Sequence, residues 1–114
     1  METMEEWVEN LKKEEALILV EGKKDKAALE KLGIRNIMTL QKPLYAVVEE
    51  IAEKEKEVII LTDLDPKGRE LFGKLSKDLQ KHGVKINNKY REFLFKETTL
   101  REIEGLTKYI LKTP

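Results

Sequence analysis

The chain of 114 residues lacks cysteine and has a single histidine, His82. It can therefore form neither a disulfide nor a zinc or iron–sulfur site with thiolate ligands, and a histidine-rich metal site is excluded within one chain. Basic and acidic side chains number 22 each, so no net charge draws the whole protein toward nucleic acid or a membrane. Its apolar runs are far shorter than a membrane span and no signal peptide is visible, so we expect a soluble cytoplasmic protein with no membrane partner.

Charge is what the sequence has in abundance. Charged residues make up 39% of the chain and hydrophobic residues 40%, which suits a single domain over residues 1–114 with a modest core. High lysine and glutamate content without cysteine is typical of a thermophilic source. Residues 1–66 carry 10 basic and 16 acidic side chains, whereas residues 67–96 carry 9 basic and 3 acidic ones. A solvated helix face explains the basic block most simply, but beside an acidic metal site it would be a phosphate-binding flank.

Strand-type and helix-type apolar patterns alternate along the chain. Short continuous apolar runs predict buried strands at 16–20, 36–40, 58–61 and 84–86. Apolar residues at helical spacing predict helices over 3–14, over 24–32, from Pro43 onward and from Pro66 to Gly83. The remainder forms a helical tail over 98–112, where Thr99 and Glu102 have the spacing of a capping box. Residues 92–95 either extend an edge strand or form a loop.

Acidic residues follow two of the predicted strands. In VIILTDLDPKG (58–68) Asp63 and Asp65 follow the third strand, and in ALILVEGKKD (16–25) Glu21 follows the first. In α/β sheets ligands bind beyond the carboxyl ends of parallel strands, at a switch point in the strand order. If the three acids cooperate, the first and third strands must be neighbours. That requirement predicts a four-stranded, mainly parallel sheet of order 2-1-3-4 with helices on both faces.

The spacing of the acids favours a metal site. Asp63 and Asp65 lie on the same side of an extended segment, about 6–7 Å apart, with Leu64 facing the core. Together with Glu21 they offer only oxygen ligands, which favours Mg²⁺, or Mn²⁺ in substitution. Such sites catalyse phosphoryl transfer, often with two metals about 4 Å apart. An isolated Asp-x-Asp is better explained as a turn with Asp65 capping a helix, so the Glu-Gly after the first strand is what favours the metal.

These paired motifs resemble a known family. VEGKKDKAALEKLG with ILTDLDPKGREL looks like the Toprim domain, which topoisomerases, bacterial-type primases, recombination mediators, OLD-family nucleases and ribonuclease M5 share. The family pattern is a Glu-Gly after the first strand and an Asp-x-Asp followed by a Gly after the third. The form EGKKD is most similar to ribonuclease M5 and to small stand-alone archaeal Toprim proteins. The resemblance covers residues 15 to about 87 and implies a three-layer α/β/α, Rossmann-like fold.

The resemblance also implies roles for individual residues. Asp63 and Asp65 would bind Mg²⁺, with two ions per chain when substrate is bound. Glu21 would bind a metal or act as the general acid or base, and Asp25 would support a second metal unless it only caps its helix. The backbone at Gly22 and Gly68 would approach the metal or phosphate closely. The cations that would hold phosphate oxygens, unless they are ordinary solvated side chains, are Lys23, Lys24, Lys67 and Arg69.

The resemblance implies a Mg²⁺-dependent hydrolase, a nuclease, or a phosphoryl-transfer domain acting on nucleic acid. A topoisomerase would need a nucleophilic tyrosine from another domain, and a primase would need a further polymerase subdomain and a zinc module. We therefore expect neither activity of this chain by itself. Ribonuclease M5 has an additional C-terminal region, which a homodimer or a protein partner would have to supply here. The alternative is a non-catalytic Toprim module that binds nucleic acid or a protein partner. A haloacid-dehalogenase-like phosphatase ranks third, because its Asp-x-Asp follows the first strand.

Overall fold

The structure of the protein is a computed structural model that describes residues 2–112. Its elements, in chain order, are α1 (Met4–Lys13), β1 (Leu17–Val20), α2 (Lys23–Lys31), β2 (Ile37–Thr39), α3 (Leu44–Lys54), β3 (Glu57–Ile60), α4 (Pro66–Lys81), β4 (Lys85–Asn87), α5 (Lys89–Glu97), the 3₁₀ turn η1 (Ile103–Gly105) and α6 (Leu106–Lys112). Within residues 2–112, no helix combines the length and apolar character that a membrane crossing requires.

The four strands form one sheet in the order β2-β1-β3-β4, and every pairing is parallel. The predicted strand order is therefore confirmed, and the sheet is parallel throughout rather than mainly so. Ile18 on β1 pairs with Ile37 on one side and with Ile59 on the other. Because β1 and β3 are neighbours in the middle of the sheet, the segments that follow them leave the same edge side by side.

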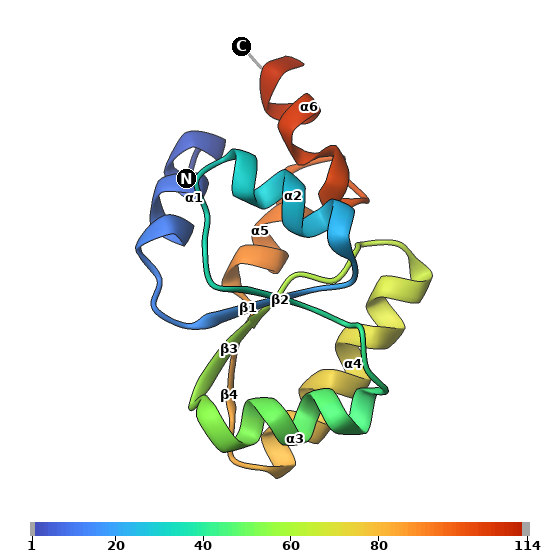
Figure 1. The fold of residues 1–114 in the computed structure, drawn as a ribbon. Helices are drawn as coiled ribbons and strands as arrows, with labels where there is room; N and C mark the ends of the chain where they lie inside the picture. The colour runs from blue at the N-terminus through green and yellow to red at the C-terminus, as the bar shows by residue number, and fades with distance from the viewer. Residues whose placement is uncertain (1, 113–114) are drawn as a thin grey trace.

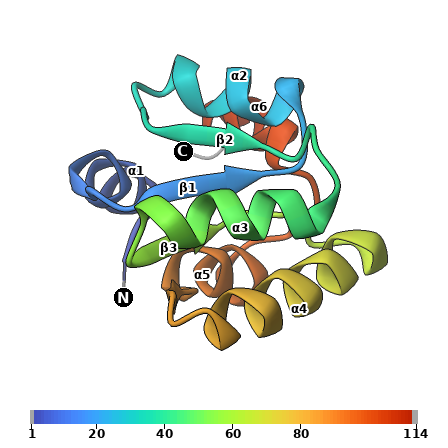
Figure 2. The same cartoon turned by 60° about the horizontal axis from the view of Figure 1, so that its bottom comes forward.

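Helices cover both faces of the sheet, giving three layers (Figures 1 and 2). One face packs against α1, α2 and α5 through a core cluster that includes Trp7, Leu29 and Leu94. The other face packs against α3 and α4 through a second cluster that includes Val48 and Leu75. Successive strand residues point to opposite faces, so the continuous apolar runs of β1 and β3 supply both clusters.

Helix α1 is capped at its start and is anchored to the domain by a buried side chain in its first turns. Thr3 and Glu6 form a reciprocal capping box, and the Trp7 side chain is fully buried. The indole Nε1 of Trp7 donates a hydrogen bond to the Tyr90 carbonyl oxygen at 3.0 Å, and the two rings meet edge to face. Trp7 is thus an anchor that joins α1 to α5.

Two local predictions for the tail were wrong. Residues 92–95 lie inside α5 rather than in an edge strand or loop, because Tyr90 and Leu94, one helical turn apart, both pack into the core. The capping box expected from Thr99 and Glu102 does not form. Thr98 makes the local contacts instead: its Oγ1 donates to the Leu94 carbonyl at 2.6 Å and accepts from the Leu100 amide at 3.1 Å.

Candidate functional site

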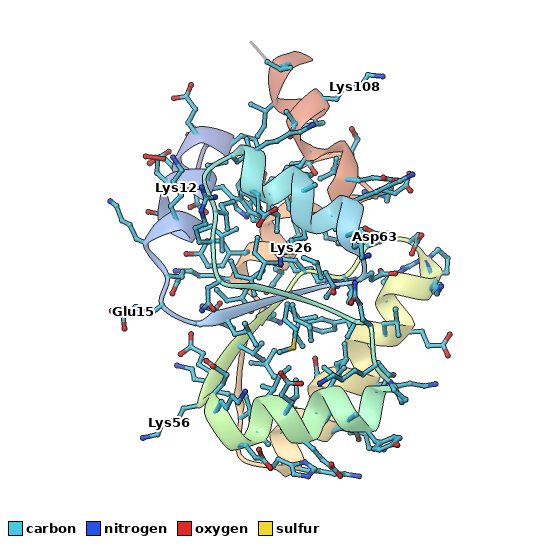
Figure 3. The ribbon with its side chains drawn as sticks, in the orientation of Figure 1. Lys12, Glu15, Lys26, Lys56, Asp63 and Lys108 are labelled. Carbon is cyan, nitrogen blue, oxygen red and sulfur yellow. The ribbon has the colours of Figure 1, made fainter. Side chains whose placement is uncertain are left out.

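Glu21 and Asp63 meet at the carboxyl edge of the sheet. Glu21 directly follows β1, and Asp63 follows β3 on the adjacent strand. The Asp63 amide donates a hydrogen bond of 2.8 Å to Oε2 of Glu21, which joins the two segments. Figure 3 shows Asp63 where α2 and α4 begin, so two helix amino termini face the same place. The amino end of a helix carries a partial positive charge, which favours anions there.

Asp65 and Gly68 shape the turn that carries Asp63. Asp65 caps α4: its Oδ1 accepts a 2.8 Å hydrogen bond from the Gly68 amide, and Pro66 occupies the first turn. A Cβ placed on Gly68 would lie 1.9 Å from the Asp63 carbonyl oxygen, so only glycine fits. The close approach at Gly68 is therefore to the loop itself. Its predicted approach to a metal or phosphate stays a prediction.

Asp25 lies in the first turn of α2, with only 7% of its surface exposed. Its Oδ2 accepts a 3.0 Å hydrogen bond from the Gly22 amide, so it caps the helix from within. Gly22 has an extended backbone, and a Cβ there would meet its nearest atom at an ordinary 3.9 Å. The protein's own packing therefore does not require glycine at this position, in contrast to Gly68.

The carboxylates raise one another's pKa values. Burial raises the pKa of Glu21, and repulsion from Asp63 and Asp65 adds to it. Burial, followed by repulsion from Asp63, raises the pKa of Asp25 to about 6. Burial and then repulsion from Asp65 likewise raise the pKa of Asp63, against the lowering effect of a backbone hydrogen bond. Negative charge is therefore only partly compensated at this edge of the sheet, which is the condition that a bound cation relieves.

The donor set fits a hard cation in its chemistry. The site has four carboxylates: Glu21, Asp25, Asp63 and Asp65. Each has one oxygen bonded to a backbone amide and a second oxygen without a hydrogen bond to the described residues. All ligands are oxygens, as Mg²⁺ and Mn²⁺ prefer. The side chains are not drawn together, however: across residues 2–112 no three Asp, Glu or His side chains are arranged to hold a metal ion. The assignment of these residues as metal ligands stays a prediction.

The four predicted phosphate-binding cations all lie on the first turns of helices that begin at this edge. Lys23 and Lys24 open α2, and Lys67 and Arg69 lie in the first turn of α4. All four are exposed, and none forms an ion pair within the described part of the chain. Lys67 lowers the pKa of Glu21 by its charge, which places it near that carboxylate. The acids are thus flanked by cations that are free to meet an anion.

Arg91 on α5 supports the loop that carries Asp63, and the sequence patterns did not identify it as a site residue. It is 9% exposed, its Nε donates to the Thr62 carbonyl at 3.1 Å, and an Nη donates to the Asp63 carbonyl at 2.8 Å. Its guanidinium also lies over the Phe72 ring, 4.6 Å from the centroid. Arg91 therefore holds the backbone that presents Asp63. Recognising α5 as a helix, from the spacing of Tyr90 and its core partner Leu94, was the signal that would have placed it.

The segment before α6 also closes over the site. The Ile103 amide donates to Oδ1 of Asp63 at 2.9 Å, and the Leu64 amide donates to the Arg101 carbonyl at 2.8 Å. Glu104, in the same turn, adds negative charge that raises the pKa values of Asp25 and Asp63. Residues 40 positions away along the chain therefore complete the surroundings of Asp63. No local sequence pattern links them.

Comparison with known proteins agrees with this picture. A sequence model of the Toprim domain matches residues 15–88. The chain is 39% identical over 118 residues to a UPF0292 protein of Methanocaldococcus jannaschii, covering 97% of this chain and 92% of the relative. It is 40% identical over 100 residues to a UPF0292 protein of Pyrococcus abyssi, covering 87% of this chain and 75% of the relative.

Two solved structures share the fold. A protein from Aquifex aeolicus superposes with a TM-score of 0.85 at 38% identity, covering 92% of this chain and 99% of the other. The Aquifex aeolicus primase, in a crystal structure of its zinc-binding and RNA polymerase domains, gives a TM-score of 0.58 at 26% identity. That match covers 94% of this chain but 28% of the primase chain, so this chain is similar to one part of that protein.

Proposed function

This chain belongs to the Toprim domain family, and from that premise we propose that it catalyses Mg²⁺-dependent phosphodiester cleavage or phosphoryl transfer on nucleic acid. Toprim domains typically bind Mg²⁺. The observation that carries the proposal is the meeting of Glu21 and Asp63 at the ends of two central strands. Beside them lie two further carboxylates and cations that form no ion pair with residues 2–112. The raised pKa values of three of these acids support it, because functional acids and metal ligands are commonly held in such environments.

Each residue has a distinct part in this proposal. Asp63, Asp65 and Asp25 would hold the metal through the oxygens that backbone amides leave free. When bound, Mg²⁺ supplies a Lewis acid that stabilises charge on the phosphate and lowers the pKa of water. Glu21 holds or transfers a proton through its Oε1, since its Oε2 is fixed by the Asp63 amide. Lysines at the starts of α2 and α4 bind phosphate oxygens, and the helix amino termini add to the attraction.

A non-catalytic module is the second candidate, and a specific observation favours it. All four carboxylates already accept backbone hydrogen bonds, and in the described residues they do not form a ready metal site. Acids whose role is only to cap helices and hold loops would make the same backbone hydrogen bonds. In that case the exposed cations beside them would bind nucleic acid or an acidic protein surface without cleaving it.

Calorimetric titration with Mn²⁺ and Mg²⁺ tests the metal site. The variant is Asp63→Asn, because an amide oxygen can still accept from the Ile103 amide and the loop should stay folded. The matched control is Glu15→Gln, an exposed acid that precedes β1 at the opposite edge of the sheet (Figure 3). We expect binding to wild type and to the control, and at least tenfold weaker binding to Asp63→Asn.

Cleavage of structured RNA and DNA in Mn²⁺ then separates the two candidates. The variant is Glu21→Gln, which keeps an oxygen for the Asp63 amide but cannot exchange a proton. Cleavage by wild type that is lost in Glu21→Gln supports the enzyme. Nucleic-acid binding by both proteins without any cleavage supports the non-catalytic module. Cleavage that persists in both Glu21→Gln and Asp63→Asn would come from a contaminant and would refute the proposal.

A further inference from the structure

A cleft beside the acidic site shares two arginines with that site, Arg69 and Arg91, and its other walls have no part in the proposed chemistry. It lies between α4 and α5 and has a volume of about 210 Å³. Its walls are formed by Arg69, Phe72, Asn88, Arg91, Glu92 and Phe95. Although α4 and α5 cover opposite faces of the sheet, Figure 2 shows them next to one another below the strands, with the start of α4 leading up to the strand ends.

The charge in the cleft is positive. Arg69 is exposed, and its charge lowers the pKa of the neighbouring Arg91 after the larger effect of burial. The only acid in the walls is Glu92, and its Oε1 is paired with Lys96 at 2.6 Å. Arg69 therefore has no anionic partner within residues 2–112. A cation that forms no ion pair with the described residues and lines a hollow suits an anionic ligand.

The cleft is also lined by two aromatic rings, those of Phe72 and Phe95. Phe95 is 46% exposed, which is unusual for a phenylalanine in a chain whose other phenylalanines are half-buried. Arg101 lies 5.8 Å from its ring centroid, and Arg91 lies 4.6 Å from that of Phe72. Each helix thus contributes one ring with an arginine beside it. Rings and guanidinium planes of this kind are the groups on which nucleobases stack.

We infer that this cleft binds one unpaired nucleotide of the nucleic acid, with its base against Phe95 and its phosphate at Arg69. The inference rests on the proposed function, because it names the form of the substrate that the same site would act on. Arg69 lies four residues after Asp65, which is about 6 Å along the helix axis. The cleft is therefore placed for a nucleotide close to the reacting phosphate.

The geometry also selects the state of that nucleotide. A base inside a duplex has both faces covered by its neighbours, so it cannot stack on a protein ring unless it is extruded. A base in a single strand, a loop or an overhang offers its face without that cost. The protein should therefore prefer unpaired nucleic acid, either RNA or DNA, over a blunt duplex of the same length.

The test measures binding alone, by fluorescence anisotropy of a short labelled single-stranded oligonucleotide in EDTA. Phe95→Ala should bind about tenfold more weakly, the loss expected when a stacking ring is removed. Arg69→Gln should bind more weakly and depend less on salt. The controls are Tyr45→Ala, which removes an exposed aromatic on α3, and Lys85→Gln, which removes an exposed cation at the start of β4. Neither control should change the affinity.

Two competitors identify what the cleft recognises. A strand with abasic sites keeps its phosphates but loses its bases, and it should bind wild type and Phe95→Ala equally weakly. Poly-glutamate should compete poorly. Equal affinities of wild type and Phe95→Ala, or equal competition by blunt duplex, abasic strand or poly-glutamate, would overturn the inference.

The result can be separated from that of the proposed function, because EDTA removes the metal. If Phe95→Ala loses binding but neither the wild type nor any variant cleaves nucleic acid, the nucleotide-binding cleft is supported and the enzymatic function is refuted. If Glu21→Gln abolishes cleavage while Phe95→Ala binds as wild type does, the enzyme stands and the cleft fails.

Discussion

Replacing Gly68 by alanine should unfold the candidate site, although alanine is normally the better residue in a helix. Gly68 lies in the first turn of α4, and its ideal Cβ would lie 1.9 Å from the Asp63 carbonyl oxygen and 2.5 Å from the carbonyl carbon. Real Cβ atoms essentially never come closer than 3.0 Å to another atom, so helix and loop must separate by about 1.1 Å. Both contacting atoms belong to the backbone, so no side chain can move aside.

The cost can be estimated from the contacts that the separation breaks. The buried hydroxyl of Thr62 donates to the Gly68 carbonyl at 2.7 Å, and an unsatisfied buried hydroxyl costs about 1–3 kcal/mol. Overpacking of this kind costs a further ~1–3 kcal/mol. The higher helix propensity of alanine offsets about 1 kcal/mol. We therefore expect Gly68→Ala to lower the free energy of unfolding by about 1–5 kcal/mol.

Gly73→Ala is the matched control. It lies in the same helix, is exposed, and its Cβ would meet no atom within 4 Å. The same substitution should raise the free energy of unfolding there by about 0.5–1 kcal/mol. Urea unfolding followed by the fluorescence of Trp7, the single tryptophan and a fully buried one, measures both variants. The steric argument is refuted if the two variants shift the midpoint in the same direction by similar amounts.

Three further predictions rest on single contacts. Arg91→Lys loses the fork that holds two loop carbonyls, so urea unfolding should show a loss of about 2–3 kcal/mol; an unchanged midpoint would exclude the bracing role. The folded-state pKa of Asp25 is raised from 3.8 to about 6, so the folded protein binds this proton more tightly than the unfolded chain does. The stabilisation that the bound proton gives is fully present below about pH 4 and is lost as the pH rises through 6. The free energy of unfolding changes by up to about 3 kcal/mol over that range. Asp25→Asn should therefore melt at a higher temperature than wild type at pH 8 in EDTA and at a similar temperature at pH 4, and the same difference at both values would contradict this. Trp7→Phe keeps an aromatic ring but loses the 3.0 Å hydrogen bond to α5, and chemical unfolding followed by circular dichroism should show a loss of about 1–3 kcal/mol; a loss below a few tenths of a kcal/mol would mean that the indole is not an anchor.

The strand order could be derived from the sequence because two kinds of information agreed. Continuous apolar runs marked strands buried on both faces, and the acids after the first and third runs required those strands to be neighbours. The 2.8 Å hydrogen bond from the Asp63 amide to Glu21 agrees with that requirement. The helices between the strands were placed within a few residues, since glycine and proline mark several of their ends, as at Gly33 and Gly83, which both have positive φ.

The tail was misread because short apolar runs do not distinguish strand from helix. EFLF has three consecutive apolar residues, and only the packing of Tyr90 and Leu94 against the core decides that they lie on a helix. The position of Arg91 depends on that helix, as does the cleft beside it. The spacing of Tyr90 and Leu94 is the one local signal for that helix, and no local pattern predicts the cleft.

The sequence by itself determined the α/β class, the parallel sheet and the pair of acids at its carboxyl edge, because these depend on residues close together in the chain and on the geometry of parallel strands. Only the tertiary structure decided what surrounds those acids: the arginine below Asp63, the Ile103 amide on its carboxylate and the exposed ring next to α4. These contacts join residues about 28 to 40 positions apart, and they depend on the core clusters that hold the helices in place.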